Sequence, residues 1–120
     1  MPSLIDADAL LERVAGDPDF LATMVDIFVA DVPTRLDAIR AGVRQSDPHV
    51  VERAAHSLKG ALATMAADTA AAEAFRLEQL GRSGSLEGAA DILTALERQV
   101  EQVTQALKRL VVETTPPDAA

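Results

Sequence analysis

Apolar residues recur along this 120-residue chain at intervals of three and four positions, the spacing that gathers side chains on one face of a helix. The first stretch with this pattern is short and covers residues 7–15, between a capping Asp6 and a terminating Gly16. The second stretch is far longer and begins at Asp17-Pro18, because proline is favoured directly after a helix cap. Its apolar stripe comprises Leu21, Met24, Val25, Phe28, Val32, Leu36, Ile39 and Val43.

Pro33 lies inside the second predicted helix. A proline in a helix interior removes one backbone hydrogen bond and crowds the preceding turn. The stretch is therefore either one kinked helix or two helices that meet end to end. We favour a kinked single helix.

Three further helical stretches follow. Asp47-Pro48 opens one that runs to about residue 66, with Val51, Ala54, Leu58, Leu62 and Met65 on its buried stripe. The next covers residues 68–81 and turns Ala70, Ala74, Leu77 and Leu80 inward. The last begins at Leu86, and its apolar positions form a seam: Leu86, Ala89, Leu93, Leu96, Val100, Val103, Leu107 and Leu110.

Four striped helices with short connections predict an all-α fold, an antiparallel up-and-down four-helix bundle with a short additional N-terminal helix. We expect residues 1–112 to form this domain and residues 113–120 to be a flexible C-terminal tail. The seam over residues 86–110 could also pair two chains as a coiled coil, since periodicity alone does not separate the two arrangements. We favour packing within one monomer, because each helix would otherwise leave its stripe in water.

Charge and composition argue against several classes of partner. With 11 basic and 19 acidic residues the chain carries a formal net charge of -8, and such a field repels nucleic acid and anionic membranes. No apolar run approaches the roughly 18 residues of a membrane span, and the first residues lack a signal-peptide pattern. The chain has no cysteine, which fits a reducing compartment. We expect a soluble, cytoplasmic protein.

Two histidines, His49 and His56, are the candidate reactive groups, because the chain contains neither cysteine nor tyrosine. Both lie on the third predicted helix, where seven positions separate them by on the order of 10 Å along the axis. That distance is too great for two ligands of one metal ion. We expect no metal site, and we expect His49 to be an ordinary solvated residue.

His56 should face solvent, since Leu58 and Met65 lie nearly opposite it at about 100 degrees per residue. Its face is shared by Glu52, Arg53, Lys59, Gly60, Ala63 and Ala67. Gly60 costs about 1 kcal/mol relative to alanine inside a helix, and access to His56 explains it better than packing does. A neutral imidazole is a nucleophile near neutral pH, and Lys59 could offset the charge of a transferred phosphoryl group. An ordinary solvated helix face has the same spacing and is the alternative.

The run Ala55-His56-Ser57-Leu58-Lys59-Gly60-Ala61 resembles the signature of histidine phosphotransfer domains, in which His-x-Leu-Lys-Gly lies within one helix of a four-helix bundle. Further residues stand where that family has similar ones: Phe28, Pro33, Asp47, Leu77, Glu78, Gly81 and Arg82. The likeness covers roughly residues 10–110. It departs at Ala66, where the family usually has glycine, and at Thr64, where a polar amide is common. These departures concern the helix end and partner contacts.

The resemblance implies a phosphorelay carrier. His56 would accept a phosphoryl group from a receiver-domain phospho-aspartate or a sensor kinase and pass it to another receiver domain. Lys59 would interact with that group, and Gly60 would leave room for the receiver. Because the sequence shows no glycine-rich nucleotide-binding segment, we expect no autokinase activity and no enzymatic turnover. We expect no cofactor here, and we expect Mg²⁺ in the receiver.

The resemblance also implies the partners: response-regulator receiver domains and a hybrid sensor histidine kinase, bound by a monomer. Docking is expected at Leu10, Leu11, Met24, Arg53 and Ala63. Two alternatives stay open. The chain could be a helical docking module that binds a receiver or kinase without accepting phosphate, or a dimeric adaptor built on the seam of residues 86–110.

Overall fold

The computed structural model describes residues 4–116, and every regular element in that range is a helix. In chain order the helices are α1 (Ala7–Arg13), α2 (Pro18–Arg44), α3 (Pro48–Thr64), α4 (Asp68–Ser83) and α5 (Ala89–Thr114). The all-α class predicted from the sequence is confirmed. Within the described range, none of the helices combines the length and the hydropathy that crossing a membrane requires.

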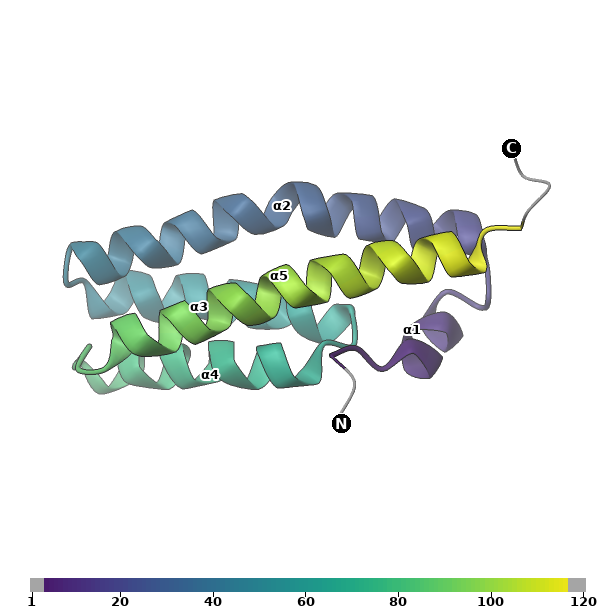
Figure 1. The fold of residues 1–120 in the computed structure, drawn as a ribbon. Coiled ribbons are helices and arrows are strands. Elements are labelled where there is room, and N and C mark those ends of the chain that lie inside the picture. Colours follow the sequence, from purple (N-terminus) through teal and green to yellow (C-terminus); the bar gives the residue numbers. More distant parts are fainter. Residues whose placement is uncertain (1–3, 117–120) are drawn as a thin grey trace.

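The four long helices lie side by side, and α1 sits near one end of the pair formed by α3 and α4 (Figure 1). Helix α2 packs against α3 and α5, and α4 packs against the same two helices. The Asp6 amide donates to the Ala66 carbonyl at 2.9 Å. Arg13 Nη1 donates to the carbonyls of Ala63 and Thr64, at 2.8 Å in each case. These bonds hold α1 against the turn between α3 and α4.

Aspartate side chains begin three of the helices, as the sequence predicts. Asp6, Asp17 and Asp47 each accept a hydrogen bond from a backbone N–H of the first turn, at 3.1, 3.0 and 3.2 Å. Proline follows at the start of α2 and of α3, where a missing N–H leaves no helical bond unmade. Helix α2 then continues through Pro33 as one helix, bowed in Figure 1, so the prediction of one helix rather than two is confirmed.

Apolar side chains from all five helices form one core. All seven seam positions of α5 are buried within the chain: Ala89, Leu93, Leu96, Val100, Val103, Leu107 and Leu110. The neighbours of α5 are α2 and α4, so the seam is covered and offers no open stripe to a second chain. Leu86, the eighth predicted seam position, lies before α5 and is half-buried. Other expected core positions that are half-buried are Met24, Val43, Ala54 and Leu80, with Ala55 buried in place of Ala54.

Helix ends differ from the predicted ones where the backbone enters the left-handed region. Ala66 has a φ of 57°, and α3 ends at Thr64 rather than near residue 66. Gly84 and Gly88 both have a φ of 83°. Gly84 directly follows α4, which therefore ends at Ser83 rather than at residue 81. Gly88 directly precedes α5, which therefore begins at residue 89 instead of 86. Helix α5 runs two residues into the expected tail of residues 113–120, of which residues 117–120 lie outside the described part.

Ser46, in the turn between α2 and α3, has a left-handed backbone with a φ of 54° and an exposed side chain. This conformation costs a residue with a Cβ roughly 1 kcal/mol and costs glycine almost nothing. We expect Ser46→Gly to raise the free energy of unfolding by about 0.5–1 kcal/mol in a urea titration. The matched change Ala38→Gly, at an exposed position inside α2, should lower it by a similar amount. A destabilised Ser46→Gly variant would contradict the turn geometry.

Candidate functional site

His56 lies near the middle of α3, with its side chain 67 % exposed. Leu58 and Leu62 of the same helix are fully buried. The prediction that His56 faces solvent is therefore confirmed. His49, in the first turn of α3, is exposed as well.

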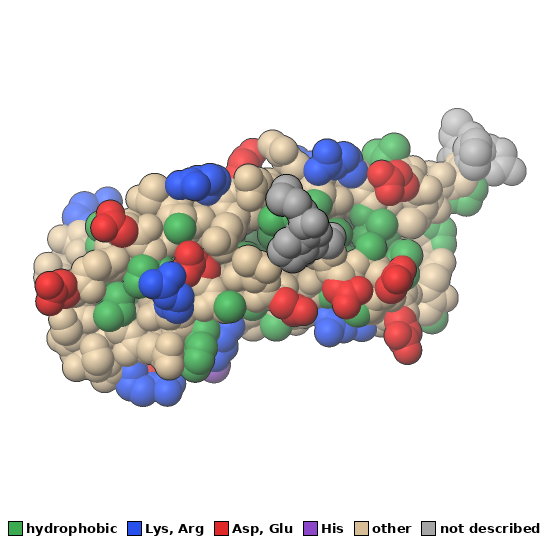
Figure 2. Space-filling model, turned by 60° about the horizontal axis from the view of Figure 1, so that its bottom comes forward, with side chains coloured by type: hydrophobic (Ala, Val, Ile, Leu, Met, Phe, Trp, Pro, Cys, Tyr) green, Lys and Arg blue, Asp and Glu red, His purple; other side chains and the backbone are tan. Residues whose placement is uncertain are grey.

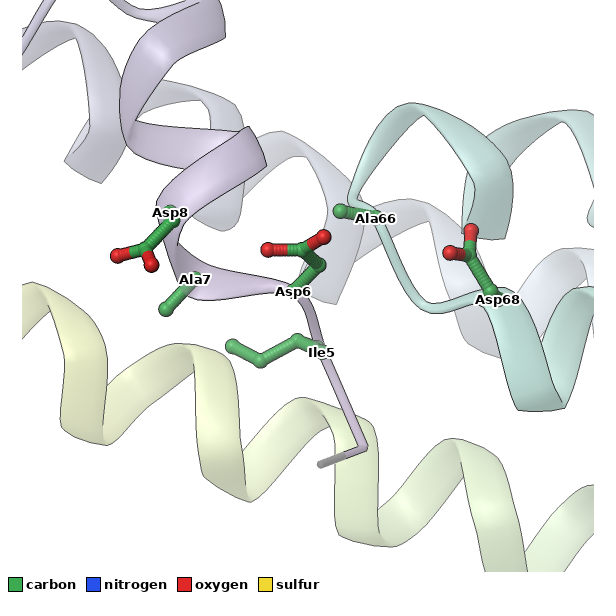
Figure 3. Close-up of a pocket in the computed structure, with 6 residues that line it drawn as sticks. All are labelled: Ile5, Asp6, Ala7, Asp8, Ala66 and Asp68. Carbon is green, nitrogen blue, oxygen red and sulfur yellow. The ribbon is translucent and has the colours of Figure 1, made fainter. Parts of the chain in front are cut away.

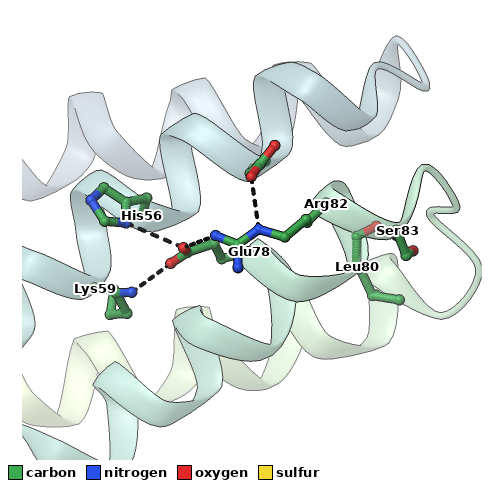
Figure 4. A network of polar contacts seen from close by, with 7 residues as sticks. His56, Lys59, Glu78, Leu80, Arg82 and Ser83 are labelled. Carbon is green, nitrogen blue, oxygen red and sulfur yellow. Dashed lines mark hydrogen bonds and ion pairs between the residues drawn. The ribbon is translucent and has the colours of Figure 1, made fainter.

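The imidazole rests against a buried carboxylate from the neighbouring helix (Figure 4). Glu78 of α4 is 2 % exposed, and its Oε2 lies 3.3 Å from Nδ1 of His56. An ionised carboxylate can only accept hydrogen bonds, so Nδ1 must carry the proton. In the neutral imidazole the lone pair then lies on Nε2, the ring nitrogen directed away from Glu78.

Two cations complete the network around Glu78. Lys59 Nζ lies 2.7 Å from Glu78 Oε1, and Arg82 Nη2 lies 2.9 Å from Glu78 Oε2. Arg82 Nε also lies 3.1 Å from Glu52 Oε2 on α3. Two cations thus face two carboxylates beside the His56 ring. A phosphoryl group on His56 would have to share Lys59 and Arg82 with these carboxylates.

Glu78 stays ionised although it is buried. Desolvation raises the pKa of this carboxyl, but the hydrogen bonds from Lys59 and His56, together with the charge of Lys59, outweigh burial and leave the pKa below its ordinary value. A lowered pKa stabilises the folded chain above the unfolded carboxyl pKa of about 4.3. That contribution is lost as the pH falls through the still lower pKa of the folded state.

Lys59 is held from two sides. Its Nζ contacts Glu78 and also lies 4.8 Å from the centroid of the Phe75 ring on α4, a cation–π distance. The ammonium is therefore fixed beside the imidazole with Glu78 as its first partner. Its role toward a phosphoryl group stays a prediction.

Gly81 allows α3 and α4 to approach closely enough for Glu78 to reach His56. A Cβ at Gly81 would lie 2.5 Å from the Pro48 carbonyl oxygen and 2.6 Å from the Glu52 amide nitrogen. Both are backbone atoms of α3 and cannot rotate aside as a side chain would. Gly60, in contrast, has no heavy atom within 4 Å of the position its Cβ would take, so packing does not require glycine there.

Gly81→Ala and Gly60→Ala should therefore change stability in opposite directions. We expect Gly81→Ala to lower the free energy of unfolding by about 2 kcal/mol, because α3 and α4 must separate. We expect Gly60→Ala to raise it by about 0.5–1 kcal/mol, because alanine is the better helix former. Chemical denaturation of the two variants measures both values. Equal changes in the free energy of unfolding would contradict the conclusion that close contact with α3 requires glycine at position 81 and not at position 60.

One residue expected at the docking surface is buried. Leu10 is 0 % exposed in the core beneath α1, so its prediction as a docking residue is wrong. The others are partly or fully accessible: Leu11, Met24, Arg53 and Ala63. Ala67 was expected on the face of His56 and is buried instead, because the chain leaves α3 at Thr64 and turns inward.

Glu78 was identified from the sequence only as part of the family likeness, with no role in the site. It lies on the inward side of α4, four residues after buried Ala74 and directly after buried Leu77. A buried carboxylate is costly unless it is paired. A charged residue among the inward apolar positions of α4 was therefore the sequence signal that Glu78 pairs with other groups in a site.

A hollow of about 450 Å³ beside α1 is separate from this network (Figure 3). Three of its lining residues are acidic: Asp6, Asp8 and Asp68. Their carboxylates point in different directions in Figure 3, and that of Asp6 caps α1. Among residues 4–116 there is no group of three or more side chains suited to hold a metal ion.

Comparison with known proteins matches residues 23–106 to the Hpt domain family, a span that contains the whole network. The crystal structure of histidine-containing phosphotransfer protein B from Pseudomonas aeruginosa PAO1 is similar in fold, with a TM-score of 0.87. The two sequences are 26 % identical, and the match covers 94 % of this chain and 98 % of that one. Among curated proteins, none matches this chain.

Proposed function

The chain belongs to the Hpt domain family, and from this premise we propose that His56 is the residue on which it carries a phosphoryl group. A histidine phosphotransfer carrier role follows from the family match and from the likeness to a phosphotransfer protein. One observation supports the assignment to His56. Its imidazole is exposed, with Nδ1 against the buried carboxylate of Glu78 and Nε2 on the opposite side of the ring.

In the proposed transfer, Nε2 of His56 attacks the phosphorus of a receiver-domain phospho-aspartate. A nitrogen–phosphorus bond forms while the bond from phosphorus to the aspartate oxygen breaks, and the aspartate leaves as a carboxylate with the bonding pair. The Nδ1 proton stays on the ring, which gains positive charge that Glu78 offsets. The aspartate of a second receiver reverses the step. Mg²⁺ is expected in the receiver and not on this chain.

Three residues prepare His56 for this step. Glu78 fixes the ring orientation and the tautomer, and Lys59 keeps Glu78 ionised and offsets negative charge on the phosphoryl group. Gly60, one turn from His56, leaves space for the receiver. This chain therefore orients the imidazole and supplies charge near it, and both lower the barrier to phosphoryl transfer. The imidazole of His56 is the group of this chain that reacts.

We further infer that the four long helices form an antiparallel up-and-down bundle, which their packing and the short turns support. The inferred partners are receiver domains and a hybrid sensor histidine kinase. We propose that these partners dock at Leu11, Met24, Arg53 and Ala63. We also propose that the chain acts as a monomer in the cytoplasm, without a cofactor and without enzymatic turnover.

A panel of phosphorylated receiver domains, incubated with the chain and Mg²⁺, tests the proposed function. A carrier acquires a label that is labile in acid and stable in alkali, as a phosphorylated imidazole is, and passes it to a second receiver. If a receiver binds the folded chain and no label is transferred, the docking-module alternative takes the place of the carrier.

A further inference from the structure

A phosphoryl group on Nε2 of His56 leaves readily only while Nδ1 of the same ring keeps its proton. With that proton the departing ring is a neutral imidazole. Without it the ring would depart as an imidazolate anion, which is a far stronger base and therefore a poor leaving group. An imidazolium in water loses such a proton around pH 6.5. Above that pH, the group that holds the Nδ1 proton decides whether the phosphoryl group can be passed on.

Glu78 is in contact with this proton. Its Oε2 lies 3.3 Å from Nδ1 of His56, and the carboxylate is buried between α3 and α4. Burial raises the pKa of Glu78, but hydrogen bonds from Lys59 and His56 leave that pKa lowered, so the carboxylate is ionised throughout the neutral range. A buried anion stabilises a cation beside it more strongly than an exposed anion does, because water screens it less.

The other charged side chains near His56 pair with one another or with Glu78. They come from three helices and are Glu52, Arg53 and Lys59 of α3, Arg82 of α4, and Asp31 and Arg35 of α2. Arg13 of α1 contacts α3 two turns further along, and α5 packs against α2 and α4. In the part of the chain that the structure describes, Glu78 is the one charged side chain that contacts a nitrogen of this ring.

Water reaches the ring of His56, whose side chain is 67 % exposed. At the lower edge of Figure 2 a histidine side chain lies at the surface beside a basic side chain. A phosphoryl group on His56 would therefore meet water as well as receiver domains. Whatever makes the ring a better leaving group speeds both reactions.

We propose that Glu78 holds the Nδ1 proton on the phosphorylated ring of His56, so that the phosphoryl group stays transferable well above the pH at which a free imidazolium loses its proton. The price is a faster loss of that group to water. Glu78 is thus a positioning residue for the release of the phosphoryl group as well as for its uptake. The proposal rests on the proposed function, because His56 must carry the group.

The release step conserves this proton. A carboxylate oxygen of the second receiver attacks phosphorus, and the nitrogen–phosphorus bond breaks with its electron pair passing to Nε2. The Nδ1 proton stays in place, so a neutral imidazole leaves. When water attacks instead, the same bond breaks, and the products are inorganic phosphate and the neutral ring.

Loss of the phosphoryl group to water, measured on this chain alone between about pH 5 and about pH 10, tests the proposal. Phosphoramidate phosphorylates histidine directly, and His49→Gln in every sample confines the reaction to His56. Phosphorus NMR identifies the loaded nitrogen and follows its signal. The rate should be high in acid and fall as the ring loses its proton, and the midpoint of that fall is the quantity compared.

We expect Glu78→Gln to lower the midpoint by about 1 pH unit, because the charge is gone and the amide can donate to an unprotonated Nδ1. At about pH 8 this variant should keep its phosphoryl group about fivefold longer than the chain with Glu78. Slower onward transfer to a receiver should accompany the longer life. A merely structural loss would expose the ring and shorten that life instead.

Two further variants separate the contact from the surrounding charge. Glu52→Gln makes the same chemical change at a carboxylate that pairs with Arg82 and not with the ring, and it should move the midpoint by less than about 0.3 units. Lys59→Met removes the cation 2.7 Å from Oε1 of Glu78, and it should raise the midpoint by about 0.5–1 unit. Circular dichroism checks the helices, and Lys59→Met decides the question if Glu78→Gln does not fold.

Three results would overturn the proposal: a midpoint in Glu78→Gln that is unchanged or raised, equal shifts in Glu52→Gln and Glu78→Gln, or a lowered or unchanged midpoint in Lys59→Met. Phosphoramidate loading that never reaches Nε2 of His56 would also overturn it. The proposed function fails separately. If no receiver gives or takes the phosphoryl group while the midpoints follow the predicted order, the carrier role is contradicted and the role of Glu78 toward the ring is kept.

Discussion

Replacing His56 with glutamine should abolish phosphoryl uptake from phosphorylated receivers, lowering its rate by at least about 1,000-fold. Glutamine has a polar tip of similar reach and lacks a nucleophilic ring nitrogen. Because His56 is exposed on α3, the variant should keep its helices and its affinity for receivers. The measurement is the rate of label transfer in the presence of Mg²⁺, with binding and circular dichroism recorded on the same sample.

His49→Gln is the matched control, since His49 is exposed on the same helix and stands in none of the contacts described for the site. We expect it to take up label within about twofold of the natural rate, because an exposed surface residue away from the reacting nitrogen contributes little. Uptake by His56→Gln at the natural rate, or its loss in His49→Gln alone, would transfer the phosphoacceptor role away from His56.

Glu78→Gln should slow phosphoryl uptake about 100-fold while keeping the size of the side chain. The amide removes the negative charge that offsets the ring charge formed on transfer, and its NH₂ group can face Nδ1 and hold the other tautomer. Lys59 and Arg82 also lose their shared carboxylate. Nitrogen NMR shifts of the His56 ring separate this positioning role from a merely structural one: the fraction with the proton on Nδ1 should fall.

The stability of Glu78→Gln gives a second test through its pH dependence. The pKa of Glu78 is lowered in the folded chain, mainly because hydrogen bonds from Lys59 and His56 outweigh burial. We expect the natural chain to be about 2 kcal/mol more stable than Glu78→Gln at neutral pH. The difference should shrink as the pH falls below about 4.3. Glu101→Gln, at an exposed position of α5, should show no such trend. A stability difference between the natural chain and Glu78→Gln that does not change with pH would contradict the ionised state of Glu78.

The helices could be predicted from the sequence because their signals are local. Asp17 and Asp47, each followed by proline, begin α2 and α3 as expected. The ends were less predictable, since Ala66 takes a left-handed φ that nothing in its residue type requires. The Ala66 carbonyl accepts a hydrogen bond from the Asp6 amide. That bond depends on where α1 packs, which the spacing of apolar residues does not specify.

The features of the site that lie on one helix could be predicted from the sequence, and the contacts between two helices could not. The direction of His56 and the openness at Gly60 follow from the helical repeat of α3 alone. The position of Glu78 beneath the ring depends on how closely α4 approaches, and that depends on the contact of Gly81 with the backbone of α3. Leu10 was misassigned for a similar reason, because the covered face of the short α1 is decided by its packing and not by its own sequence.

The position of the phosphoryl group on the natural chain tests the central claim most directly. After transfer from a receiver, nitrogen and phosphorus NMR of the chain labelled in its histidine rings identifies both the residue and the ring nitrogen that carry phosphorus. The buried carboxylate beside Nδ1 predicts phosphorus on Nε2 of His56, with the Nδ1 proton retained. Phosphorus on Nδ1 of His56, on His49 or on a residue other than histidine would contradict the account.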